Sequence, residues 1–303
     1  MKSFLGIFYL CYILSAQMQD INIFPSDFNK KQLSKITILD AKVLSFEDKN
    51  EISFKGVSDI AYNDNILYAI SDFGYLYKLK IDIKDNKISL LELIDATHLK
   101  TKKNKNLKKK SSDAEGLFFT KEGLIVSFER KPKVSLYNFN AKKIKNFKIK
   151  KELQDISNYQ KKNRALEAVV KHPIFGIITA PEEPLVYESK NYHIFYSKKK
   201  VWKFKRSSRI TAFEILSDNN LLVLEREYHF YGHTIVLKKV NIMNCKKEVC
   251  DSEILAKLET SNGWTLDNFE GLAKVGDNLY LMISDDNDNF LQKTILVLFM
   301  VKK

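Results

Sequence analysis

The feature that most constrains the fold is an internal repeat of short hydrophobic strands separated by polar turns. Five copies of one unit can be aligned, each with two strands joined by a turn and charged residues at the outer ends. The copies begin near Gly56, Asp113, Ala165, Ile210 and Asn268. Repeats of roughly 45–60 residues, with room for about four strands each, predict a β-propeller. A single repeat cannot cover both faces of its own sheet, so neighbouring blades must do so.

The two ends of the chain predict how the ring closes. The segment KITILDAKVLSF, residues 35–46, belongs to no repeat, and the last repeat, which ends in TILVLF at 294–299, lacks an outer strand. We therefore expect the N-terminal strand to complete the C-terminal blade, because this removes two exposed sheet edges. The count gives five blades, or six if residues 81–112 or 241–267 contain a degenerate repeat. A β-sandwich or two small β domains are the alternatives.

We expect one all-β domain over residues 33–303, because a chain with 45% hydrophobic residues can bury a large core. Residues 1–18 are typical of a secretory signal peptide, with an early lysine, an apolar run and small residues at Ser15 and Ala16. The apolar run is too short to span a bilayer comfortably, and no later stretch looks transmembrane. A buried or anchoring N-terminal segment is the alternative. The sequence thus predicts a periplasmic or secreted monomer without a stable membrane span.

Two cysteines remain once the signal is removed, Cys245 and Cys250, in NCKKEVCD. An even number of cysteines at this short spacing in an exported chain predicts a local disulfide rather than a metal site. The net charge is +13, and of 50 basic residues only five are Arg. The densest run, KTKKNKNLKKK at 100–110, contains no aromatic residue and is expected to be a solvated loop. Anionic cell-surface material is an alternative partner, whereas nucleic acid is not expected.

Acidic residues recur at both ends of the paired strands. In a propeller blade, the start of the innermost strand and the end of the second strand lie at the same end of the blade. We therefore expect Glu115 to lie close to Glu129 and Arg130, at one mouth of the central channel. The same pairing is expected for Glu167 with Glu182 and Glu183, for Glu270 with Asp285 and Asp286, and for Asp59 with Asp72. In the fourth repeat, Ala212 takes the place of the first acid, although Glu225 and Arg226 follow the second strand.

The rare arginines strengthen this prediction. Arg130 and Arg226 align at the same repeat position, and Arg164 precedes Glu167 by three residues. Arg presents a rigid planar fork that binds carboxylate or phosphate with two hydrogen bonds, which Lys does not. Each Arg could pair with a neighbouring Glu and join two blades. Alternatively, some of them face a bound anion or orient acids around a metal ion.

Other chemistries have weak signals. There is no G-x-S-x-G motif, and ten glycines leave little room for a glycine-rich phosphate loop. His229 and His233 are four residues apart, but their strand-like context favours turn or groove residues over metal ligands. The run SDDND, residues 284–288, lacks the spacing and glycine of a helix-loop-helix calcium loop, so a polar turn is favoured over a dedicated calcium loop.

Several of these segments resemble the phytase-like family known as "esterase-like activity of phytase". They are DAEGLFF and GLIVSFERK, LEAVV and IITAPEE, ITAFEIL and NNLLVLEREY, and DNFEGLAKVGDNLYLMISDDNDNFLQKTILVLF. The most specific part combines Asn268–Leu272 with Ser284–Asn287, Phe290 and Gln292, and the resemblance runs from about Lys35 to Val301. It implies an exported β-propeller. It also implies calcium held by acids at the channel mouth, a role open to Glu115, Glu129, Glu167, Glu270, Asp285 and Asp286. The chain departs from the family pattern at Ala212 and in its lysine-rich loops.

Two functions follow as hypotheses. The first is a hydrolase of phosphoesters or carboxyl esters that acts on a small anionic or ester substrate, with calcium as its expected cofactor. Its catalytic candidates are Glu115, Glu129, Arg130, Glu167, Arg226 and Glu270, and its metal-ligand candidates are Glu115, Glu270, Asp285 and Asp286. The second is a non-catalytic propeller that binds a ligand or an unknown partner of the cell envelope in the same mouth, because the fold serves both roles.

Overall fold

The computed structural model describes residues 18–29, 33 and 35–302, and its strands form five antiparallel sheets, one for each predicted repeat. Each sheet is a blade, numbered here in chain order. Blade 1 contains β3 (Val57–Asn63), β4 (Ile66–Ser71), β5 (Tyr75–Lys84) and β6 (Lys87–His98). Blade 2 contains β7 (Ala114–Thr120), β8 (Gly123–Phe128), β9 (Lys133–Tyr137) and β10 (Lys143–Phe147). Blade 3 contains β11 (Leu166–His172), β12 (Gly176–Pro181), β13 (Tyr192–Ser197) and β14 (Val201–Lys205). Blade 4 contains β15 (Arg209–Ile215), β16 (Leu221–His229), β17 (Gly232–Val240) and β18 (Ser252–Glu259).

Blade 5 joins the two ends of the chain. It contains β19 (Asn268–Lys274), β20 (Leu279–Asp285), β21 (Ile295–Val301), β2 (Ile36–Leu44) and β1 (Met18–Asp20). β2 pairs with β21 in antiparallel fashion from Ile36–Val301 to Val43–Ile295, so the predicted ring closure is confirmed. β1 adds a fifth strand to the outer edge of β2, which the sequence did not predict. β1 and the buried Ile23 extend the domain to residues before 33. The expected signal peptide covers residues 1–18. Its first 17 residues lie outside the described residues, and Met18 belongs to β1.

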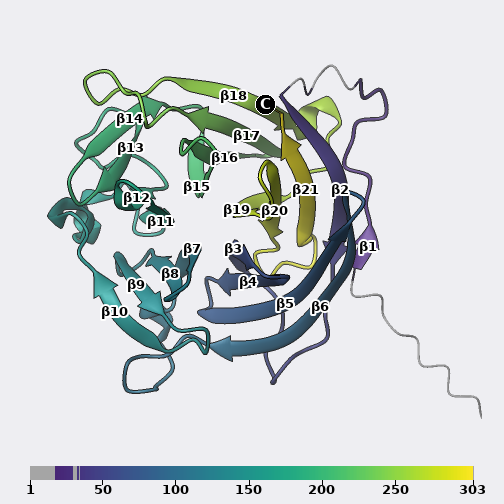
Figure 1. Ribbon diagram of the computed structural model, residues 1–303, viewed down its shortest axis with the longest axis horizontal. Coiled ribbons are helices and arrows are strands. Elements are labelled where there is room, and N and C mark those ends of the chain that lie inside the picture. The colour runs from purple at the N-terminus through teal and green to yellow at the C-terminus, as the bar shows by residue number, and fades with distance from the viewer. Residues whose placement is uncertain (1–17, 30–32, 34, 303) are drawn as a thin grey trace, which may run out of the picture.

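The innermost strands surround the channel in the order β3, β7, β11, β15 and β19 (Figure 1). Short 3₁₀ helices lie in the connections, namely η2 (Lys109–Ser111), η3 (Lys151–Leu153), η4 (Ile156–Asn158) and η5 (Thr260–Asn262). The prediction of five blades is therefore confirmed. The regions 81–112 and 241–267 supply outer strands and connections of blades 1, 4 and 5 and contain no sixth blade.

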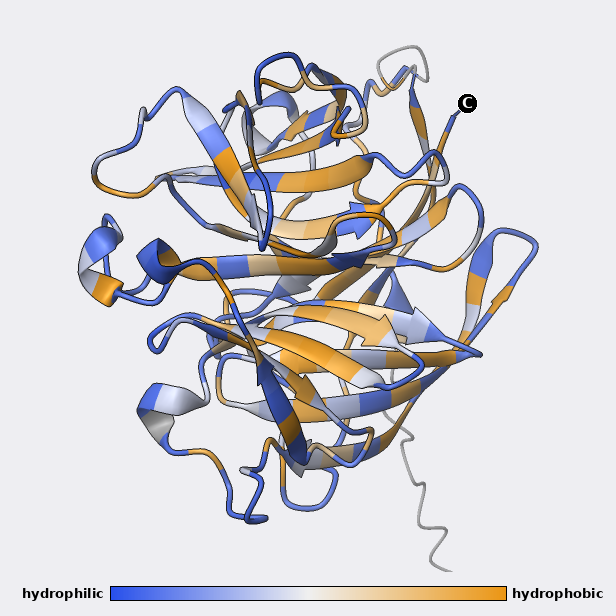
Figure 2. Ribbon diagram, turned by 60° about the vertical axis from the view of Figure 1, so that its left-hand side comes forward, coloured by the Kyte–Doolittle hydropathy of each residue, from blue (hydrophilic) through white to orange (hydrophobic). Residues whose placement is uncertain are grey.

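The hydrophobic core lies between the blades. Five buried clusters are present, and each is shared by two neighbouring blades, as for blades 1 and 2, whose shared cluster contains Leu76, Leu124 and Phe128. The sheet faces are accordingly apolar, whereas the loops at the blade ends are polar (Figure 2). Each blade thus depends on its neighbours for its core, as a repeat architecture requires.

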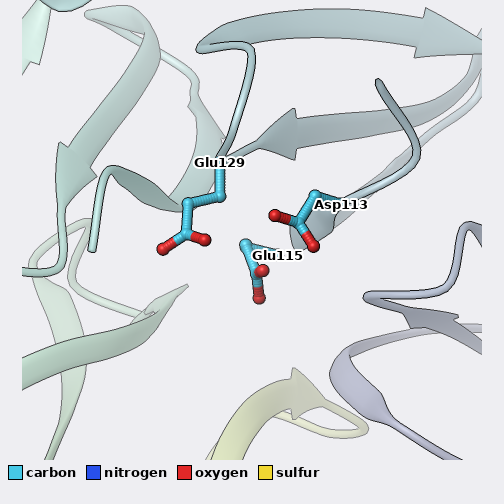
Figure 3. A group of neighbouring side chains, drawn as sticks. All are labelled: Asp113, Glu115 and Glu129. Carbon is cyan, nitrogen blue, oxygen red and sulfur yellow. The ribbon is translucent and has the colours of Figure 1, made fainter. Parts of the chain in front are cut away.

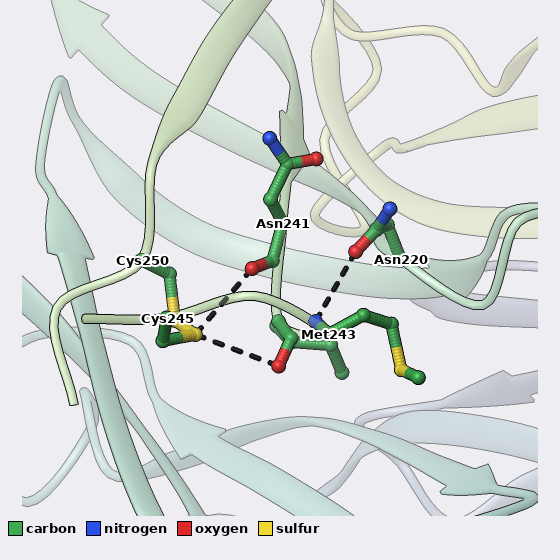
Figure 4. Close-up of a disulfide and its surroundings, with 6 residues drawn as sticks. Asn220, Asn241, Met243, Cys245 and Cys250 are labelled. Atoms are coloured by element: carbon green, nitrogen blue, oxygen red, sulfur yellow. Dashed lines mark hydrogen bonds between the residues drawn. A yellow bond between two sulfur atoms is a disulfide. The ribbon is translucent and has the colours of Figure 1, made fainter. Parts of the chain in front are cut away.

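The predicted disulfide joins Cys245 to Cys250 in the loop between β17 and β18 (Figure 4). The same loop is held at two further points. Met243 donates its backbone N–H to Asn220 Oδ1 at 3.3 Å, and Lys203 in β14 exchanges backbone hydrogen bonds with Glu248 and Cys250. The disulfide therefore fixes a loop that connects blade 4 to the outer strand of blade 3.

Among the described residues, no helix is long and apolar enough to cross a membrane. The lysine-rich segment 100–110 is mostly exposed and lacks long regular structure, as the sequence predicted.

Candidate functional site: an acidic channel mouth

The innermost strand of each blade carries a β-bulge at the same place, close to one mouth of the channel. In all five blades, the register between the first and second strands shifts by one residue near the start of the first strand. A bulge leaves one residue unpaired and changes the direction of its side chain. The bulged residues are Ser58, Glu115, Glu167, Thr211 and Glu270.

This register corrects the sequence alignment of the repeats by one residue in two blades. Ser58 and Thr211, rather than Asp59 and Ala212, are equivalent to the three glutamates. The same register separates the two arginines that the sequence had aligned. Arg226 is equivalent to Glu129, and Arg130 lies one residue further along its loop. The sequence alignment was wrong because the hydrophobic residues on both sides of the bulge can be aligned in either of two registers. No residue type marks the bulge itself.

Close packing between blades explains why a glycine follows two of the bulged glutamates, Glu115 and Glu270. A Cβ atom on Gly116 would lie 2.6 Å from the backbone oxygen of Glu167, and one on Gly271 would lie 2.8 Å from Cα of Asp59. The innermost strands of adjacent blades therefore approach each other closely at these glycines. The Glu-Gly-Leu motif thus combines a carboxylate directed to the mouth with the only residue that fits beside the next blade.

Asp59 occupies the position after the bulge in blade 1 and is fully buried. Its Oδ1 accepts hydrogen bonds from the backbone N–H groups of Ile60 and Leu272, at 2.8 and 2.9 Å, and its Oδ2 accepts one from Leu117 at 2.7 Å. The expectation that Asp59 lies against Asp72 at the mouth is therefore wrong. Asp59 instead connects blade 1 to blades 2 and 5.

A compact group of three carboxylates lies in blade 2 at the mouth. Oxygen atoms of Asp113, Glu115 and Glu129 are all within 4.8 Å of one another (Figure 3). Asp113 and Glu115 flank the start of β7, and Glu129 follows β8, so the predicted approach of Glu115 to Glu129 is confirmed. Glu129 also accepts a hydrogen bond from the backbone N–H of Ala165 at 3.2 Å, which holds it against blade 3. Asp113 was visible at the start of the strand but was not among the predicted site residues.

Burial raises the pKa of many carboxylates of the mouth above their ordinary values. Burial, with the nearby charge of Asp113, raises the pKa of Glu129 to about 8. Burial, with the charges of Asp113 and Glu270, raises the pKa of Asp72 to about 7. Burial also raises the pKa of Glu182 to about 7, although three arginines oppose the shift. Burial and neighbouring carboxylates hold the pKa values of Glu115, Glu167 and Asp285 well above their ordinary values. Such a ring either retains protons or binds a cation.

The other predicted acids differ in their surroundings. Glu270 forms an ion pair with Arg226 at 2.7 Å, and its pKa is raised by burial. Asp285 accepts a hydrogen bond from the backbone N–H of Asn287. Asp286 accepts one from the backbone N–H of Gly56 at 3.0 Å and one from Thr294, which ties blade 5 to blade 1. In the described part of the chain, the group close enough to share one ion is Asp113, Glu115 and Glu129, and it does not include Glu270, Asp285 or Asp286.

All five arginines of the chain form ion pairs with acids of this mouth. Arg130 Nε lies 2.8 Å from Asp113 Oδ2, and Arg226 bridges Glu270 and Glu182. The remaining three, Arg164, Arg206 and Arg209, contact Glu183. Arg206 and Arg209 were not among the predicted site residues, although their scarcity in a lysine-rich chain could have drawn attention to them.

The histidines and serines near the mouth have structural roles. His229 and His233 lie in the β16–β17 hairpin, where His229 Nε2 contacts Thr234 Oγ1 at 3.1 Å. Ser127 Oγ donates a hydrogen bond to the backbone oxygen of Glu167, and Ser284 Oγ donates one to Lys293. Neither serine is paired with a histidine base within the described residues, so the geometry of a serine esterase is not seen there.

A family model described as "Phytase-like: Esterase-like activity of phytase" matches residues 52–288. A comparison with curated proteins finds no match. Among solved structures, the chain is similar to Myxococcus xanthus glutaminyl cyclase, with 9% identity, a TM-score of 0.47, and coverage of 88% of this chain and 97% of that chain. It is also similar to the PQQ-bound aldose sugar dehydrogenase of Streptomyces coelicolor, with 9% identity, a TM-score of 0.45, and coverage of 88% and 98%. At these scores the similarities carry no argument about function.

Proposed function

Because this chain belongs to the phytase-like family, esterase-like activity of phytase, we propose that it is a calcium-dependent hydrolase of phosphoesters. The reaction takes place at the acidic mouth of the propeller. The observation that carries the proposal is the group of three carboxylates, Asp113, Glu115 and Glu129, beside guanidinium groups in one mouth. Hard carboxylate oxygens suit calcium, and guanidinium forks suit phosphoryl oxygens.

The donor set fits a divalent cation. Three carboxylates that approach one another this closely are protonated or neutralised by a cation, because like charges raise the pKa of each neighbour. Asp113, Glu115 and Glu129 would hold the ion, and solvent or substrate would complete its coordination. Bound calcium would supply Lewis acidity to a phosphoryl oxygen or a water molecule.

The chain itself contributes fixed charges and proton transfer. Arg226 is oriented by Glu270 and Glu182, so its guanidinium can bind phosphoryl oxygens without reorganisation. Glu182, with a pKa of about 7, can exchange a proton near neutral pH. Arg130 on blade 2 and Glu167 on blade 3, both candidates from the sequence, complete the charged surroundings of the substrate.

We propose phosphoesters rather than carboxyl esters as substrates because of the contacts that the serines make. Ser127 and Ser284, the serines at the relevant strand ends, use their hydroxyl groups in hydrogen bonds to backbone oxygens. A serine nucleophile for acyl transfer would need a base in place of those contacts. The proposal also includes export as a monomer. The signal-like composition of residues 1–18 and the Cys245–Cys250 disulfide, which suits an oxidising compartment, support the export.

A non-catalytic propeller that binds a ligand or an envelope partner is the second candidate. The observation that favours it is that every arginine already has an acidic partner in the mouth. In this case the ion pairs would stabilise the packing of the blades, and the mouth would bind without turnover.

Hydrolysis by the chain from residue 18 onwards tests the proposal. Phytate, a simple phosphomonoester and a short acyl ester are each offered with calcium and with chelator. We expect phosphate release that requires calcium and that falls on the order of 100-fold in Glu115→Gln. The matched control is Glu122→Gln, which removes an exposed acid at the opposite end of the same hairpin, where it pairs with Lys145 and Lys171. Absence of turnover on all three substrates by the folded protein with calcium would favour the binding propeller.

A further inference from the structure

The charges of the mouth are divided between two halves. Blades 3 and 4, with their connecting loops, carry Arg164, Arg206, Arg209 and Arg226, which pair with Glu182, Glu183 and Glu270. Blade 2 carries one arginine, Arg130, beside its three carboxylates. Blades 1 and 5 add Asp72, Asp285 and Asp286. Blade 3 also carries Glu167, whose pKa is held well above its ordinary value by burial and neighbouring carboxylates. One half of the mouth can therefore attract a cation, and the other half can attract an anion.

In the half of the mouth formed by blades 3 and 4, three guanidinium groups converge on one carboxylate oxygen. Arg164 Nη1, Arg206 Nη2 and Arg209 Nε lie 3.1, 3.5 and 3.0 Å from Glu183 Oε1. Burial alone would raise the pKa of Glu183, but Arg209 and Arg164 lower it below its ordinary value, so the carboxylate is ionised. Glu182 lies beside the cluster, 4.0 Å from Arg164 Nε, and its pKa of about 7 leaves it partly ionised at neutral pH. Three guanidinium charges against Glu183 and this second carboxylate therefore leave an excess of between one and two positive charges.

The four residues of this cluster stand at the ends of strands. Arg164 precedes β11, Glu183 follows β12, and Arg209 begins β15. Arg206 is fixed by a hydrogen bond from its Nε to the backbone oxygen of Ser208 at 2.9 Å. The arginine side chains retain between 21% and 24% of their exposure. They are therefore positioned by the fold and still accessible from the mouth.

The cluster has more donors than its protein partners use. Within the described residues, four hydrogen bonds join the three guanidinium groups to protein acceptors. Each guanidinium offers donors on all three of its nitrogen atoms, so several remain for a ligand. A phosphate group supplies three strong acceptor oxygens and a charge of about −1.5 to −2 at neutral pH, which matches the excess charge.

We propose that Arg164, Arg206 and Arg209, with Glu183 as their internal counter-ion, form a subsite for a phosphate monoester group. A ligand carboxylate would carry less negative charge than a phosphate group and offer fewer acceptors. The subsite deepens the proposed function by naming the group that the substrate presents to blades 3 and 4. Its test does not depend on catalysis.

Isothermal titration of the chain from residue 18 onwards, in chelator at pH 7, measures the binding of inorganic phosphate and of glycerol phosphate. We expect saturable binding of both at one site, weakened on the order of 10- to 100-fold in Arg206→Gln/Arg209→Gln. The control Lys102→Gln/Lys103→Gln removes two exposed charges from the lysine-rich loop and should leave binding unchanged. Equal weakening in both double variants would overturn the proposal, because the attraction would then come from overall charge. Binding of inorganic phosphate without glycerol phosphate would overturn the assignment to an ester.

Glu183→Gln provides a test of opposite sign. Removing the counter-ion raises the excess charge, so phosphate should bind several-fold more tightly than in the unchanged protein. Unchanged or weaker binding would contradict the subsite even if the arginine variants fail to fold. Because both titrations use calcium-free protein, a chain that hydrolyses no substrate can still bind phosphate at the subsite. Conversely, an active hydrolase can lack it.

Discussion

At the scale of single residues, Asp59 shows how one carboxylate can hold several blades together. It accepts backbone hydrogen bonds from its own blade and from both neighbouring blades, at a position where no solvent can replace it. Burial disfavours the charged carboxylate and raises the pKa of Asp59, while the three N–H donors oppose this shift. The residue therefore contributes to folding and not to the mouth.

Replacing Asp59 by alanine should lower the free energy of unfolding by about 3–5 kcal/mol, because buried N–H donors of Leu117 and Leu272 lose their acceptor. Chemical denaturation with the change followed by circular dichroism measures the effect. The adjacent Ser58→Ala is the control. Ser58 Oγ is buried and forms no hydrogen bond among the described residues, so its loss should change stability by less than about 1 kcal/mol. Equal effects of the two substitutions would contradict the role of Asp59.

The direction of single side chains was the feature that the sequence predicted least well. The acids at the ends of the strands were sufficient to predict that Glu115 approaches Glu129. A one-residue bulge, however, decides whether an acid faces the mouth or the interior, and the sequence did not reveal its position. Asp59 and Glu115 therefore looked equivalent, although one bonds the backbone of three strands and the other lies in the group of carboxylates.

At the scale of elements, the N-terminal strand β2 decides whether the ring is closed. It covers the edge of β21, a strand whose residues are almost all buried, and its own Ile36, Ile38 and Ala41 enter the core between blades 4 and 5. An uncovered hydrophobic edge of this kind is a site of aggregation. The unpaired strand and the incomplete last repeat made this closure predictable, whereas the three residues of β1 carry too little pattern to be recognised.

Deletion of residues 1–44 should prevent formation of a stable monomer, because β21 loses its neighbour. Size-exclusion chromatography should show aggregates, and thermal scans should lack a cooperative transition. A synthetic peptide of residues 18–46 should restore a monomeric complex by adding the missing strand. Deletion of residues 1–17 alone is the matched control and should leave the transition unchanged. A monomeric, cooperatively unfolding chain without residues 1–44 would show that closure does not require β2.

At the scale of the whole molecule, the carboxylates of the mouth couple stability to pH. Asp72 and Glu182 have pKa values of about 7 in the folded protein and Glu129 about 8, all above the ordinary values near 4. A raised pKa means that the folded state holds protons that the unfolded state releases. These groups therefore favour the fold below pH 4, and the benefit is lost as the pH rises from about 4 to about 8.

The melting temperature without calcium should accordingly fall between pH 5 and pH 8.5. Calcium should reverse the fall at pH 8.5 and have little effect at pH 5, because protons then occupy the carboxylates that would bind it. Differential scanning calorimetry with calcium and with chelator measures both effects. A melting temperature that rises with pH in chelator would contradict the protonated mouth. Equal stabilisation by calcium at both pH values would contradict its binding to these acids.

The pairing of β2 with β21 also has a consequence for how the molecule is made. Strand β2 is synthesised before the five innermost strands, and its partner β21 follows only after all four strands of each of blades 1 to 4. Blades 1 to 4 can assemble before β21 has emerged, but blade 5 stays open until β21 is available. During that interval β2 exposes an unpaired edge for the time needed to synthesise some 250 residues, tens of seconds at ordinary translation rates. A newly made chain would thus need a chaperone, or a delay in folding, at its first strand rather than at its last.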